Sequence, residues 1–164
     1  MLTFKINEIP KGKSTDKFEI NERDLDLRGL EFRALTLNME FEKREFTLLV
    51  TFHFDAEVQL ICDRSLDEYW QPLTGSYSIL FKVDAQEESE DDQMSVRRLD
   101  ISGNIINIEN EVRDTILLAV PLKKIHPRYF DKNGELIELE LPKEASDEID
   151  PRWEALKNLK ETNL

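Results

Sequence analysis

Cysteine, histidine and glycine are all scarce in this chain. It has one cysteine, Cys62, and two histidines. Cys62 therefore cannot form a disulfide within the chain or build a cysteine zinc site alone. None of the five glycines falls in the spacing of a phosphate-binding loop, and the chain has no GxSxG nucleophile motif. We therefore expect no metal, no cofactor and no enzymatic activity.

Cys62 could in principle act as a nucleophile with His53 or His126 as its base. However, Cys62 continues the apolar positions of a strand, where a free cysteine usually behaves as a small buried hydrophobe. This pattern favours a structural thiol over a catalytic one.

Long apolar runs and an excess of positive charge are also missing. No stretch approaches the roughly 20 apolar residues of a membrane span. The N-terminus lacks the basic and apolar regions of a signal peptide, so we expect a cytoplasmic protein without membrane contact. The net charge is −13 over 164 residues. A nucleic-acid-binding chain with this charge must concentrate its cations in one patch, since phosphate contacts carry most of the affinity.

Strict alternation of apolar and polar residues is the strongest signal of secondary structure in this sequence. All nine even-numbered positions of residues 46–62 are apolar, and the odd ones are mostly polar. This period predicts a strand with one face on a core, and its length leads us to expect a bulge or a bend within it. Residues 35–41 alternate in the same way before a polar turn at 42–45. A third strand is predicted at 76–83, after the turn signals Pro72 and Gly75, which completes an antiparallel meander.

The remaining segments complete an α+β prediction. Residues 1–30 suggest short strands separated by turns, with a loop at 10–14. Residues 84–95 carry six acids and no base, which is typical of a mobile solvated loop. Residues 95–104 suggest a further strand, and 107–120 suggest a helix with Asn107 as N-cap and Pro121 as its stop. We expect a twisted antiparallel sheet, with a barrel-like closure left open, in one domain over 1–146.

A short helix is predicted near the end of the chain. Asp150 is a good N-cap and Pro151 a preferred first residue. Trp153 begins an apolar side, and Arg152 projects from that side too, where it would meet a carboxylate, an aromatic ring or a phosphate. Such a short helix is marginal alone. Residues 147–164 are therefore predicted to form a docking helix and tail, either on this domain or on a partner.

The segment after Pro121 is the only locally basic one. Its cations are Lys123, Lys124, Arg128 and Lys132, and Tyr129 and Phe130 lie among them. Such a mixture could hold RNA by charge and stacking. It could equally be a loop that simply follows a helix.

Three motifs resemble a known family, the YceD-like proteins, or large ribosomal RNA subunit accumulation proteins. "CDRSL" is similar to the family's Cys-x-Arg-Cys-Leu motif, with Cys62, Arg64 and Leu66 matching and Ser65 replacing the second cysteine. The segment around the predicted helix end is similar as well. Its matching residues are Asn107, Leu118, Ala119, Val120, Pro121, Leu122 and His126. "DPRW" matches the family's C-terminal ending through Asp150, Pro151, Arg152 and Trp153.

The resemblance implies a non-enzymatic bacterial or organellar factor in ribosome biogenesis. It would act in the accumulation or processing of large-subunit ribosomal RNA, by contact with RNA in a precursor particle. Some family members carry cysteines that could bind zinc, but Ser65 removes that option here. The candidate contacts to RNA or another partner are Arg64, Lys123, Lys124, Arg128 and Arg152. Alternatively, the acidic surface holds a basic ribosomal protein, as an acidic chaperone would.

Overall fold

The protein is described by a computed structural model, in which residues 2–85, 88–91, 93–100 and 102–137 are placed. The chain divides into two units, residues 1–126 and 127–164. The predicted C-terminal helix lies outside the described residues, together with Asp150, Pro151, Arg152 and Trp153. The described elements of the first unit are β1 (Thr3–Lys5), β2 (Gly12–Ile20), β3 (Phe32–Lys43), β4 (Thr47–Ile61), β5 (Glu68–Lys82), β6 (Ser89–Glu90), β7 (Met94–Arg98), β8 (Ile105–Asn107) and α1 (Glu109–Ala119); the second unit has the short 3₁₀ helix η1 (Pro127–Tyr129).

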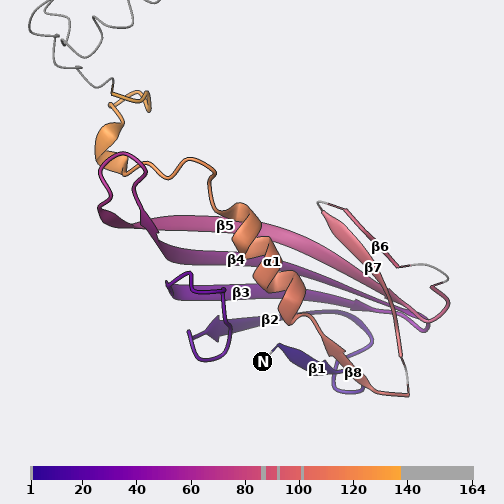
Figure 1. Ribbon diagram of the computed structural model, residues 1–164. Coiled ribbons are helices and arrows are strands. Elements are labelled where there is room, and N and C mark those ends of the chain that lie inside the picture. The colour runs from indigo at the N-terminus through magenta and orange to yellow at the C-terminus, as the bar shows by residue number, and fades with distance from the viewer. Residues whose placement is uncertain (1, 86–87, 92, 101, 138–164) are drawn as a thin grey trace, which may run out of the picture. The chain divides into compact units, whose positions relative to one another are not determined.

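The main sheet has the strand order β2-β3-β4-β5-β7-β6 (Figure 1). The predicted antiparallel meander is confirmed for β3 to β5, and β2 adds a further antiparallel strand beside β3. The sheet as a whole is mixed, because β7 pairs with β5 in parallel. β6 forms a hairpin with β7 on the outer side, so that β7 runs in the direction of β5. β2 and β6 are the two edges, and the sheet is therefore not closed into a barrel. β1 and β8 form a separate two-stranded sheet.

β4 confirms the predicted alternation of buried and exposed side chains. Its even-numbered residues from Leu48 to Leu60 are buried, whereas His53 and Asp55 are exposed on the other face. The expected bulge within β4 is wrong, since β4 and β5 pair without a register shift from Thr47 to Ile61. The irregularity lies in β3 instead, between Arg33 and Thr36, where Ala34 has a φ of 52°.

β5 is much longer than predicted and passes through both supposed turn signals. Pro72 is tolerated because β7 pairs only with Ser78 to Lys82, so this part of β5 needs no second partner for its backbone. Gly75 makes room for a buried ring: a Cβ there would lie 2.6 Å from Cε1 of Phe54. Pro72 and Gly75 are therefore both compatible with a continuous strand. β2 likewise runs through most of the predicted loop at 10–14.

The acidic segment is not one continuous loop. Ser89–Glu90 form β6, and β7 begins at Met94. Between them, the Asp91 carboxylate accepts hydrogen bonds from the backbone N–H groups of Gln93 and Met94 at 2.9 and 2.8 Å. These bonds close a tight turn and hold the pKa of Asp91 below its usual value.

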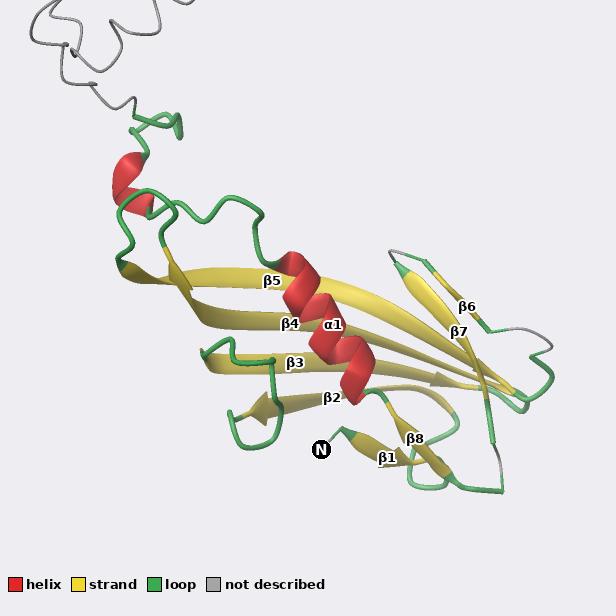
Figure 2. Cartoon of the chain, viewed as in Figure 1, coloured by secondary structure: helices red, strands yellow, loops and turns green. Residues whose placement is uncertain are grey.

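Helix α1 crosses the strands on one face of the sheet (Figure 2) and packs mainly against β5. It buries Val112 and Ile116, and Ile108 just before it is also buried. The helix begins at Glu109, with Ile108 as its N-cap, rather than at Asn107 as predicted. Asn107 still contributes, because its Oδ1 accepts a hydrogen bond from the Glu109 N–H at 2.9 Å. The helix ends before Pro121, as predicted.

Candidate functional site

The loop between β4 and β5 carries the Cys62 motif. The Cys62 N–H donates to the Asp67 carbonyl at 2.9 Å, and the Leu66 N–H donates to the Cys62 carbonyl at 2.8 Å. Leu66 adopts a φ of 61° and leaves 78% of its surface exposed. The backbone thus folds into a compact loop at one end of the sheet.

Three hydrogen bonds join this loop to the segment that follows α1. The Asp63 N–H donates to the Lys124 carbonyl at 2.7 Å, and the Lys124 N–H donates to Asp63 Oδ2 at 2.8 Å. The His126 N–H donates to Cys62 Sγ at 3.3 Å. We call this connection the loop clamp. It unites two motifs that lie more than 50 residues apart in the sequence.

The Cys62 side chain is fully buried. Its burial raises the pKa of the thiol, but hydrogen bonds from the His126 N–H, the Ser65 hydroxyl and the N–H groups of Arg64 and Ser65 together lower that pKa to about 7. These donors stabilise a thiolate inside the loop clamp. Since no sulfur surface is accessible, the arrangement suits a structural hydrogen-bond acceptor. The predicted burial of Cys62 is confirmed.

Tyr69 supports the loop clamp from β5. Its ring lies 5.2 Å from the imidazole of His126, centroid to centroid. Burial raises the pKa of Tyr69, and the negative charges of Cys62 and Asp63 raise it further. His126 therefore takes part through both its backbone and its ring.

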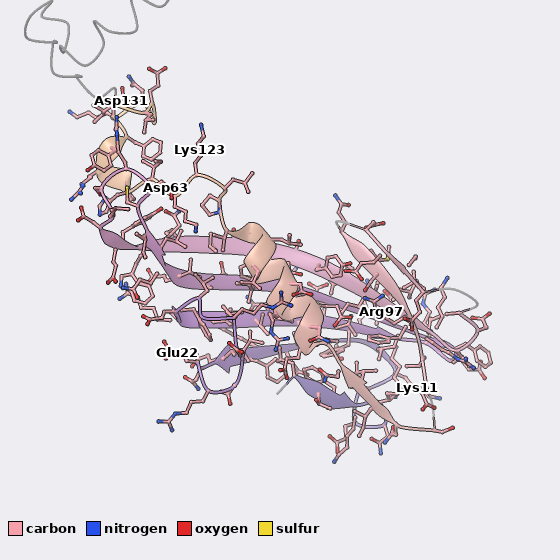
Figure 3. All side chains as sticks on the ribbon, in the orientation of Figure 1. Lys11, Glu22, Asp63, Arg97, Lys123 and Asp131 are labelled. Atoms are coloured by element: carbon pink, nitrogen blue, oxygen red, sulfur yellow. The ribbon has the colours of Figure 1, made fainter. Side chains whose placement is uncertain are left out.

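The cations predicted to bind a partner are only partly brought together. Arg64 is half-buried in the loop, Lys124 is half-buried in the clamp, and Lys123 beside it is exposed. Asp63 and Lys123 lie toward the same end of the sheet in Figure 3, whereas Arg97 and Lys11 lie toward the other. Pro121 is exposed, between α1 and the clamp.

Arg128 belongs to the second unit. Its guanidinium carbon lies 4.9 Å from the centre of the Tyr129 ring, and its Nη2 donates to the Tyr129 hydroxyl at 3.1 Å. Within that unit the predicted mixture of cations and aromatic rings is thus present as a neighbouring pair. Arg152 falls outside the described residues.

Sequence reasoning missed a second arginine–aromatic pair, on the first unit. The guanidinium carbon of Arg33 lies 4.2 Å from the centre of the Trp70 ring. Arg33 Nε also donates to Glu57 Oε2 at 2.6 Å. Trp70 could have been noticed as an aromatic residue shortly after the Cys62 motif, but the predicted strand began only at residue 76. Asp63 and Tyr69 carried no comparable local signal.

Among the described residues, no group of three or more His, Cys, Asp and Glu side chains could hold a metal ion. In the same part of the chain, no helix combines the length and the apolar composition that crossing a bilayer requires.

Comparison with known proteins agrees with the motifs. The family described as "Large ribosomal RNA subunit accumulation protein YceD" matches residues 50–160, which is more than half of the chain and includes all three motifs. No match was found among curated proteins or among solved structures. The resemblance inferred from the Cys62, Pro121 and Asp150 motifs is therefore confirmed, and the chain belongs to the YceD family of large ribosomal RNA subunit accumulation proteins.

Proposed function

We propose that this protein promotes the accumulation of large-subunit ribosomal RNA as a non-enzymatic factor that contacts RNA in a precursor particle. Family membership supports the link to large-subunit ribosomal RNA. On this proposal the protein works in the bacterial cytoplasm, where the precursor particle assembles. No chemical step is required of it, since a factor that holds RNA needs only a binding surface.

The loop clamp is the observation that carries the proposal. It fixes Lys124 against Asp63 through two hydrogen bonds, and it thereby holds Lys123 and Arg64 at the same end of the sheet. An acidic chain can bind RNA only where its cations are concentrated. The clamp gathers three cations at this end, where Asp63, Asp67 and Glu68 balance their charge, so this end is locally neutral on a chain of net charge −13.

The acidic segment is well separated from this end. It begins after Lys82, at the far end of the 15-residue strand β5, whereas the clamp adjoins the first residue, Glu68. At about 3.3 Å per residue the strand spans roughly 45 Å, several times the Debye length of about 8 Å at physiological salt. Even the β6–β7 hairpin, which returns to the level of Ser78, stays many residues from the clamp. Repulsion from these acids is therefore screened at the clamp.

A salt titration tests the proposal. The purified protein should bind single-stranded RNA weakly, and its affinity should fall steeply between ~50 mM and ~200 mM salt. Replacing both Lys123 and Lys124 by Gln removes two phosphate contacts. The slope of log affinity against log salt should then become shallower by roughly 1.4, since each contact to a single strand contributes about 0.7.

The matched control replaces Lys11 and Lys13 by Gln, which removes the same charge; Lys11 lies toward the opposite end of the sheet (Figure 3). This control should leave the slope unchanged. Equal effects of the two double variants would mean that only net charge matters. Absence of RNA retention at ~50 mM salt would refute the proposal.

A basic ribosomal protein is the second candidate partner. It is favoured by a groove of about 410 Å³ beside α1, which is lined by Tyr77 and the exposed Leu118 and by four carboxylates, those of Glu90, Asp91, Glu111 and Asp114. Against it, Glu90 and Glu111 already hold Arg97, and Asp91 caps a turn. Retention of a purified basic ribosomal protein, combined with no RNA retention at low salt, would favour this function instead.

A further inference from the structure

Trp70 lies on the outer face of the sheet, away from α1. It follows the buried Tyr69 in β5, and its register partner in β4 is Gln59, between the buried Val58 and Leu60. Other outward-facing residues of these strands, such as His53 and Asp55, are exposed. Trp70 is half-buried on this mostly polar face, where the exposed Ile61 and Pro72 are its apolar neighbours in register. Tryptophan is rarely buried completely, so the groups that cover part of its ring are informative.

Arg33 lies over the indole ring of Trp70. The irregularity after Arg33 in β3 aligns this residue with Glu57, whose carboxylate holds the guanidinium through the 2.6 Å bond from Nε. The guanidinium carbon is then 4.2 Å from the ring centre. The side chain of Arg33 nevertheless remains 55% exposed. The pair therefore presents a planar, oriented cation to solvent.

A hollow adjoins this pair. It has a volume of about 600 Å³ and is lined by Asn21, Arg23, Phe32 and Arg33, among others. Arg33 thus connects the hollow with Trp70. Trp70 itself is two residues from Glu68, where β5 leaves the loop that carries Arg64. The pair lies at the clamp end of the sheet, where the proposed function places RNA.

We propose that Arg33 and Trp70 form a stacking site for a base of single-stranded RNA, an inference that rests on the proposed function. Unstacked bases stack on aromatic rings and on guanidinium planes with little regard to sequence. The nearby acidic residues favour the binding of an uncharged base over the binding of a phosphate. Glu57 and Glu68 repel a phosphate, whereas an uncharged base can approach the Arg33–Glu57 pair without that penalty.

The test compares the affinity of variants for a short oligoadenylate, measured by fluorescence anisotropy of the labelled RNA. Trp70→Leu should weaken binding by roughly 5- to 150-fold, and Trp70→Phe should keep most of the affinity, because a ring remains for stacking. The salt slope should stay unchanged in Trp70→Leu, because no phosphate contact is lost.

A matched pair of arginine variants separates stacking from charge. Arg33 and Arg44 are both exposed and both paired with a glutamate at 2.6 Å, but only Arg33 lies over a ring. Arg33→Gln should weaken oligoadenylate binding several-fold more than Arg44→Gln. A lowered melting temperature would reveal that Trp70→Leu is unfolded. In that case the comparison of Arg33→Gln with Arg44→Gln tests the stacking site without it.

The outcomes distinguish the two proposals. RNA binding by the unaltered protein, with equal affinity in Trp70→Leu and equal effects of the two arginine variants, would overturn the stacking site and leave the proposed function intact. No RNA binding by the unaltered protein at low salt would overturn both.

Discussion

Cys62 contributes hydrogen bonds in addition to its burial. The sequence indicated a buried hydrophobe, and the residue is buried, but its sulfur also accepts hydrogen bonds that lower the pKa of the thiol to about 7. The His126 N–H is one of these donors, so the thiolate strengthens the loop clamp. Periodicity predicted where the side chain lies. It could not reveal the donor from His126, which approaches from 64 residues away.

The stability of the protein should therefore rise with pH between about 7 and 9. In the unfolded chain the thiol has a pKa of about 8.5. A pKa that is lower in the folded state stabilises the fold fully above the unfolded value, and this contribution is lost as the pH falls through about 7. The urea midpoint of the unaltered protein should accordingly increase from pH 7 to pH 9.

Cys62→Ser supplies the comparison, since serine does not titrate in this range. The difference in midpoint between the two proteins should widen as the pH rises. Parallel curves would mean that Cys62 stays a neutral thiol.

At the scale of elements, β5 shows what a local pattern cannot settle. Pro72 and Gly75 are ordinary turn residues by sequence, yet both lie inside the strand. Whether they interrupt a strand depends on the neighbouring strand and on Phe54, which the local sequence does not contain. β4 was predictable because its alternation requires no knowledge of a partner. The parallel pairing of β7 was not predictable, since short strands carry no signal for direction.

Gly75→Ala should destabilise the protein by about 1–3 kcal/mol, the usual cost of overpacking a core. The new methyl group would lie 2.6 Å from Cε1 of Phe54, a ring that is buried and cannot easily move. Chemical denaturation measures this cost.

Gly103→Ala is the matched control, because the three atoms nearest to its methyl group all belong to the exposed Asp100, the closest being Oδ2 at 3.1 Å. Its effect should stay within about 0.5 kcal/mol. Equal losses for both variants would show that Phe54 yields to the new group.

At the scale of the molecule, the net charge of −13 does not tell where the acidic and basic residues lie in the structure. The acidic segment and the loop clamp adjoin opposite ends of β5. Sequence motifs marked Cys62 and Arg64 in one segment and His126 in another, and the clamp brings these two segments together. They could not predict the part played by Asp63, Tyr69 or Trp70, because each acts through a tertiary contact. The predicted C-terminal helix stays a prediction.

Depletion of the protein should lower the amount of mature large subunits relative to small subunits. The reason is the proposed role in large-subunit ribosomal RNA accumulation, which a missing factor would impair. Sucrose-gradient profiles of depleted cells measure this ratio. Re-expression of the unaltered protein should restore it, and the Lys123/Lys124→Gln variant should restore it less well. An unchanged profile on depletion would contradict the proposed role.

The loop clamp also has a consequence in time. Its hydrogen bonds join residues that are 61 and 64 positions apart, so the contact closes only after the chain has been made through His126. At a synthesis rate of about 5–20 residues per second, the segment that completes the clamp is made several seconds after the β4–β5 loop. A nascent chain therefore carries the Cys62 motif without the completed surface. The order of synthesis delays closure of the loop clamp until all strands of the sheet and α1 have been synthesised.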